Sequence, residues 1–152
     1  MFRTHVSRAT SLVMVLTAVV GLALPVSADN SVPFRGRADA VVTGVEPVPG
    51  GLLLTVAATG EATHLGRFTR EERVVLGANG TLVGRLVFTA ANGDQLFADV
   101  AGGFVSPTTA VGTYTFTGGT GRFRNASGGA DFVGETTDGV HLALTFEGTL
   151  GF

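Results

Sequence analysis

The chain of 152 residues contains no cysteine, no tryptophan and no lysine, and its formal net charge is −2. Without cysteine the protein cannot form a disulfide framework, a thiolate metal site or a cysteine nucleophile. The slightly acidic balance argues against a basic surface that would bind nucleic acid. These absences exclude several functional classes, and the length predicts a single domain.

Residues 1–28 have the three-part layout of a cleaved secretory signal. Two arginines precede the apolar run Leu12–Leu24, and the small-residue ending Val26-Ser27-Ala28 follows it. This run is shorter than the roughly 20 residues that a membrane-spanning helix needs. We therefore expect cleavage after residue 28 and one domain, 29–152, in a secreted or periplasmic location; an uncleaved anchor is the alternative.

Glycine is abundant, with 23 residues in the chain. Such a content indicates either disorder or many tight turns, and 11 phenylalanines together with many Val and Leu residues argue against disorder. A secreted domain without disulfides has to satisfy its own backbone hydrogen bonds and build a real core. A closed β-barrel does both.

Apolar and polar residues alternate along the mature region. In Val140–Glu147 every second residue is apolar, and Leu82–Ala90 has the same rhythm. Asn79-Gly80, Asn92-Gly93 and Asp138-Gly139 are typical of tight hairpin turns. The other expected strands are about 36–46, 51–59, 65–76, 95–102, 111–118 and 129–137, and Pro33, Pro47, Pro49 and Pro107 fall outside them.

About eight strands joined mostly by short turns predict an all-β fold: a single antiparallel eight-stranded up-and-down β-barrel. A Greek-key sandwich would need longer connections. The glycine-rich corner Gly118–Gly121 permits backbone angles that a Cβ would forbid, and Phe123 after it is expected to plug one end of the barrel. A phosphate-binding loop would need a Gly-Lys-Ser/Thr ending, which this segment lacks.

The corner resembles the Gly-Gly-Ser/Thr-Gly-x-Phe segment of the barrel shared by plant dirigent proteins and allene oxide cyclases. A wider stretch is similar to exported bacterial proteins of unassigned function. The resemblance implies an eight-stranded, calycin-like barrel, activities that depend on polar groups inside the cavity, and subunits that can pair as a homo-oligomer. The segments that carry it are Ala62–Thr69, Ala90–Leu96, Gly118–Phe123 and Thr145–Gly148.

His64, near Glu61, is a candidate general base because imidazole titrates near neutral pH; the alternative is a surface histidine in a turn. Arg67 and Arg85 are the other candidate catalytic residues. Arg67 belongs to a charged cluster with Arg70, Arg73, Glu71 and Glu72, and any of these arginines that points inward would be a costly buried charge and a candidate ligand anchor. Arg85 and Asp99 would likewise be candidate ligand anchors if their side chains pointed into the barrel.

No nucleophile elbow and no metal-ligand spacing accompany these residues, so we expect no cofactor and no metal. The expected function is binding of a small apolar ligand or a structural role. The first alternative is a cyclase-like or dirigent-like enzyme or stereochemical guide, which requires polar side chains that converge in a cavity. The second is an outer-membrane barrel, suggested by the alternation over Leu144–Phe152. An interior packed solid would exclude an internal site; the residues expected to pack it are Leu82, Leu86, Phe88, Phe116, Leu142, Leu144 and Phe146.

Overall fold

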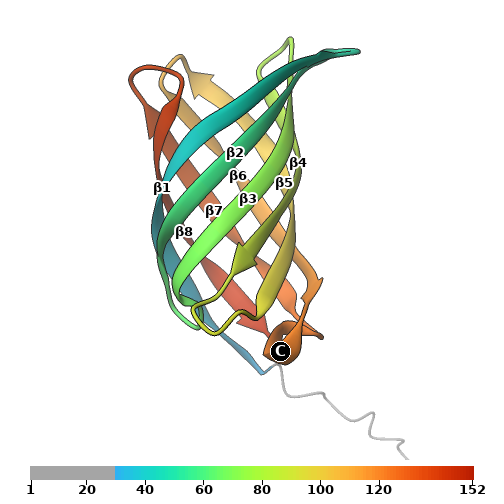
Figure 1. Ribbon diagram of the computed structural model, residues 1–152, viewed down its shortest axis with the longest axis vertical. Helices are drawn as coiled ribbons and strands as arrows, with labels where there is room; N and C mark the ends of the chain where they lie inside the picture. Colours follow the sequence, from blue (N-terminus) through green and yellow to red (C-terminus); the bar gives the residue numbers. More distant parts are fainter. Residues whose placement is uncertain (1–29) are drawn as a thin grey trace, which may run out of the picture.

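The computed structural model describes residues 30–152, which form a closed antiparallel barrel in which each strand pairs with the next and β8 pairs with β1 (Figure 1). This confirms the predicted up-and-down barrel. The predicted signal, 1–28, lies outside the described residues. The elements are β1 (Ser31–Val48), β2 (Gly51–Ala62), β3 (Gly66–Gly77), β4 (Thr81–Thr89), β5 (Gln95–Ser106), β6 (Thr109–Gly119), the 3-10 turn η1 (Gly121–Phe123), β7 (Ser127–Thr136) and β8 (His141–Gly151).

The three predicted hairpin dipeptides do connect neighbouring strands. Gly80, Gly93 and Gly139 have φ values of 83°, 90° and 74°, which a side chain rarely adopts. Each turn needs this backbone angle, and therefore each is occupied by glycine. Within residues 30–152, no helix is long and apolar enough to cross a membrane.

The prediction for two prolines was wrong, because Pro33 and Pro47 both lie inside β1. Pro33 pairs with Thr149 of β8 before the pairing with β2 begins, and Pro47 pairs with Leu52 of β2 after the pairing with β8 has ended. At both positions β1 has one neighbour only. A strand tolerates a missing N–H at such an edge, so β1 extends further than its prolines suggest.

Aromatic side chains fill the end of the barrel at which the β2–β3, β4–β5 and β6–β7 connections lie. Phe34 packs against the rings of Phe116 and Phe146, with centroids 5.0 and 5.4 Å apart. Phe123, the last residue of η1, is fully buried in the same core, and η1 lies at this end of the barrel (Figure 1). The predicted plug is therefore present, and this end is closed.

The opposite end is built by the four remaining hairpins, of which β1–β2 reaches beyond the rest of the wall (Figure 1). A β-bulge between Val42 and Gly44 shifts the register of β1 against β2. One extra residue reverses the alternation of side chains. Val45 consequently turns to the inner side of the hairpin, where Leu54 is its partner.

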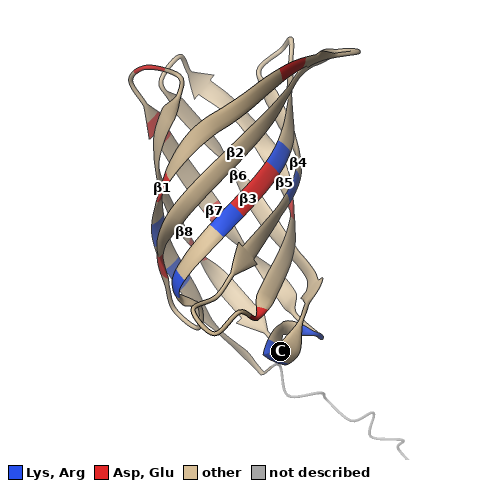
Figure 2. Ribbon diagram, viewed as in Figure 1, with Lys and Arg blue, Asp and Glu red and all other residues tan. Residues whose placement is uncertain are grey.

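The outer wall carries most of the charge. Exposed ion pairs join Arg35 to Glu147 and Arg85 to Asp99 across neighbouring strands. The longest charged stretch, Arg70–Arg73, lies in the middle of β3 (Figure 2). Because side chains alternate along a strand, two of these four residues have to point into the barrel.

Candidate functional site

The interior is packed at the closed end and hollow at the other. A cavity of about 340 Å³ lies under the hairpins of the open end, and its wall is almost entirely apolar. Of the residues expected to fill the core, Leu86, Phe88, Phe116, Leu144 and Phe146 pack in the main core, and Leu142 packs against it. Leu82, Leu142 and Leu144 also line the cavity. The lining includes Val42, Leu54, Val74, Leu76, Leu82, Phe104, Leu142 and Leu144, with Arg70, Glu72 and Thr136 as its polar members.

Arg70 and Glu72 enter the cavity from β3 because they occupy inward positions of its alternation, between Phe68 and Val74. Their side chains are 3% and 8% exposed and form an ion pair. The Arg70 guanidinium also donates a hydrogen bond to the hydroxyl of Tyr114, with Nη1 and Oη 2.8 Å apart. A charged pair and a phenol thus sit where the apolar cavity meets the aromatic layer.

Burial alone would lower the pKa of the Arg70 guanidinium, but the neighbouring Tyr114 and Glu72 outweigh it and the pKa is raised. Arg70 therefore stays positively charged. Burial also raises the pKa of Tyr114 to about 12, against the opposing attraction of Arg70. The phenol is consequently neutral at physiological pH, and its oxygen can accept the hydrogen bond from Arg70.

The packing around Tyr114 fixes the orientation of the pair. Its ring stacks on Phe132 with centroids 4.7 Å apart and an interplanar angle of 12°. The central guanidinium carbon of Arg70 lies 5.3 Å from the centroid of the Tyr114 ring and 5.9 Å from that of Phe88, within the range of cation–π attraction. The Arg70 side chain is therefore held by a hydroxyl, a carboxylate and two aromatic faces.

The predicted candidates His64, Arg67 and Arg85 all lie on the outside of the molecule. His64 occupies the turn between β2 and β3 with φ of 65°, and its carbonyl oxygen accepts a hydrogen bond from Arg122. The side chains of Arg67 and Arg85 are 89% and 88% exposed and pair with carboxylates of the outer wall. None of the three lines the interior cavity.

The conditional prediction that one arginine of the β3 cluster points inward is met by Arg70. Alternation from Phe68 to Val74 is the signal that identifies it, together with Glu72. Sequence reasoning missed Tyr114 as a partner, since only the barrel closure brings β6 within reach of β3 side chains. In the described range 30–152, no three His, Asp or Glu side chains are grouped so that they could hold a metal ion.

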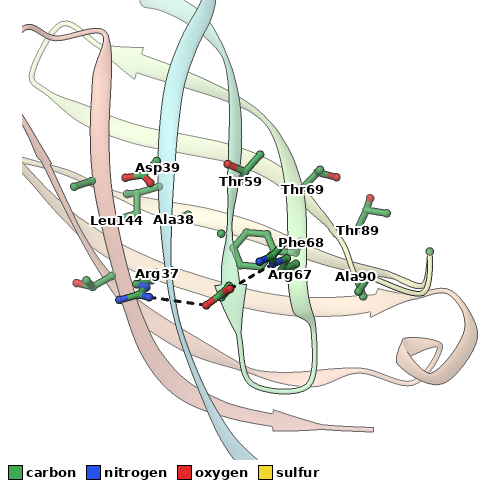
Figure 3. A pocket seen from close by; sticks show the side chains of 16 residues that line it. Arg37, Ala38, Asp39, Thr59, Arg67, Phe68, Thr69, Thr89, Ala90 and Leu144 are labelled. Atoms are coloured by element: carbon green, nitrogen blue, oxygen red, sulfur yellow. Dashed lines mark ion pairs between the residues drawn. The ribbon is translucent and has the colours of Figure 1, made fainter.

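A second, shallower depression runs across the outer wall from β8 to β4 (Figure 3). Glu61 forms ion pairs there with Arg37 and Arg67, at 3.9 and 3.6 Å. A row of short side chains lies beside these pairs: Asp39, Thr59, Thr69 and Thr89 (Figure 3). The depression is open to solvent and its lining is more polar than that of the interior cavity.

No protein-family model matches this chain, and no curated protein matches it. The solved structure of a dirigent protein, described as a pterocarpan synthase, is similar to it with a TM-score of 0.61 and 15% sequence identity. The match covers 92% of this chain and 99% of the other. It confirms that the fold is similar to that of a dirigent protein, and at this identity it shows the fold alone.

Proposed function

We propose that the protein binds a small, largely apolar molecule inside the open half of its barrel. The observation that carries the proposal is the cavity of about 340 Å³, which is walled mainly by aliphatic side chains and has only three polar lining residues, Arg70, Glu72 and Thr136. Ligand sites in proteins combine a concave apolar surface of this size with a small number of placed polar groups. An interior without a binding role would be packed throughout, as the aromatic half is.

The N-terminal sequence indicates where the protein would bind its ligand. We infer a secreted or periplasmic protein from the signal-like residues 1–28, with the cavity facing an extracytoplasmic solution. Exposed ion pairs on the wall, such as Arg35 with Glu147 and Arg85 with Asp99, argue against the outer-membrane alternative. A lipid-facing wall would have to place these charges in hydrocarbon.

A second candidate function is a stereochemical guide or enzyme acting on an apolar intermediate. The pair Arg70 and Glu72, which converges with Tyr114 beside the cavity, favours this candidate, because such chemistry needs polar groups inside the barrel. The two functions differ in what happens to the ligand. Chiral chromatography of a ligand recovered from the protein separates them, since a binding protein returns its ligand unchanged and a guide alters the stereochemistry of the product.

The binding proposal is tested with N-phenyl-1-naphthylamine, an uncharged dye whose fluorescence rises in apolar surroundings. We expect saturable binding of one dye per chain. In the Ala40→Leu variant, the larger side chain enters the cavity from β1, and dye affinity should fall at least about tenfold. Ala57→Leu is the matched control, because Ala57 is exposed on the outside of β2 and its replacement should leave affinity unchanged.

Circular dichroism of both variants separates lost binding from lost folding. Absence of saturable dye binding by the unmodified protein would contradict the proposal. Equal affinities in folded Ala40→Leu and Ala57→Leu would contradict it as well, because the dye would then occupy a different surface.

A further inference from the structure

One hydrogen-bond donor among the polar groups of the cavity has no acceptor. Arg70 carries five N–H donors, and its partners are the Tyr114 hydroxyl and one oxygen of Glu72. Its Nε is buried, and no residue in the described range 30–152 accepts a hydrogen bond from it. A buried donor left without a partner costs free energy. Because Arg70 lines the cavity, an occupant with an oxygen acceptor that reaches the guanidinium is favoured there.

The charges around Arg70 limit what that occupant can be. A carboxylate would gain attraction from Arg70 but would lie beside Glu72, which has the same sign and is itself buried in the cavity wall. An ammonium group would meet the opposite conflict, because it would approach the buried guanidinium. In an apolar cavity, like charges at short distance are strongly unfavourable. Charged head groups of either sign are therefore disfavoured.

A hydroxyl group fits both partners. Its oxygen accepts a hydrogen bond from the guanidinium, and its proton can be donated to the Glu72 carboxylate. Thr136, the third polar residue of the wall, already accepts a hydrogen bond from the backbone N–H of Gly139 in the β7–β8 turn. The group of the cavity that still lacks a hydrogen-bond partner therefore belongs to the Arg70–Glu72 pair.

We propose that the ligand is an uncharged molecule with an apolar body and one hydroxyl group, which enters first and is anchored between Arg70 and Glu72. The aliphatic wall, from Leu54, Val74 and Leu142 outward, holds the apolar body. This inference rests on the proposed function, since it specifies the class of molecule that the same cavity takes.

The test uses four probes that share one ring and differ only in the head group: benzyl alcohol, toluene, benzoate and benzylammonium. Dissociation constants come from NMR titration of the protein, with shifts followed at methyl groups of the cavity. We expect benzyl alcohol to bind at least as tightly as toluene, although its hydroxyl loses more hydration on entry. Benzoate and benzylammonium should bind at least about tenfold more weakly than benzyl alcohol.

A double variant provides the matched comparison. Arg70→Met combined with Glu72→Leu replaces the ion pair by apolar side chains of similar size and leaves no uncompensated charge. In this variant the preference for benzyl alcohol over toluene should fall about tenfold, because the hydroxyl loses both partners. If the double variant does not fold, the head-group series on the unmodified protein decides the inference alone.

The outcomes distinguish this inference from the proposed function. Binding of the probes without dependence on the head group would overturn the hydroxyl anchor and leave the binding cavity intact. An unchanged ratio of benzyl alcohol to toluene in the folded double variant would do the same. Absence of any shift at the cavity methyl groups with all four probes would overturn both.

Discussion

Tyr114 offers a direct test of the buried polar group, because it is the only tyrosine in a chain without tryptophan. Its pKa is raised from 10.0 to about 12, mainly by burial. Absorbance at 295 nm reports ionisation of the phenol and contains no contribution from another residue. A pH titration of the folded protein should therefore show the phenolate near pH 12, whereas the protein unfolded in urea should titrate near pH 10.

The same shift determines how stability depends on pH. Between the two pKa values the folded protein retains the phenolic proton and the unfolded chain has lost it, so the free energy of unfolding falls as pH rises. The contribution of Tyr114 is fully present below about pH 10 and is lost as the pH passes through about 12. Two pKa units correspond to about 3 kcal/mol.

Urea unfolding at pH 9 and at pH 11.5, followed by circular dichroism, should show about 2 kcal/mol of this loss, because pH 11.5 is still below the pKa of the folded protein. The Tyr114→Phe variant is the control, because its stability should lack the decrease that the phenol causes. A phenol that titrates near pH 10 while the protein is still folded would show that Tyr114 is exposed to water and not buried beside the cavity.

Two further predictions concern the residues that shape the interior. Arg70→Met alone leaves Glu72 buried without its partner and should lower the free energy of unfolding by about 3–5 kcal/mol, whereas the double variant with Glu72→Leu should cost no more than about 1 kcal/mol. Equal losses in urea unfolding would show that the pair is not buried. Gly84→Ala would place a Cβ 2.1 Å from the carbonyl oxygen of Arg73 and should cost at least about 2 kcal/mol, against less than about 1 kcal/mol for Gly44→Ala, whose Cβ has no atom nearer than 3.5 Å. Thermal melting compares the two, and similar melting temperatures would contradict the close packing of β3 on β4.

The fold was predictable because its signals are local. The alternation in Val140–Glu147 fixes which side chains of β8 face inward, and Asn-Gly or Asp-Gly dipeptides mark three of the turns. Both features act within a few residues. The extent of β1 was underestimated for the opposite reason, since only the pairing of its neighbours shows that Pro33 and Pro47 lie at tolerant positions.

The candidate site was less predictable because it forms only when the eight strands close into a barrel. Periodicity shows that Arg70 and Glu72 share a face of β3, but neither composition nor spacing shows that this face lines a hollow half of the barrel. The contact between Arg70 and Tyr114 joins residues 44 positions apart. His64 was predicted as a general base only because of the chemistry of imidazole, and the structure places it in an exposed turn.

Methyl-resolved NMR during a toluene titration measures whether the open half of the barrel binds an apolar ligand. We expect saturable shifts at Leu54, Val74 and Leu142, which line the cavity, and none at Val83 and Val133, which are exposed on the outer wall. Shifts confined to the outer valines, or no saturable shift at the cavity methyl groups, would contradict binding in the cavity.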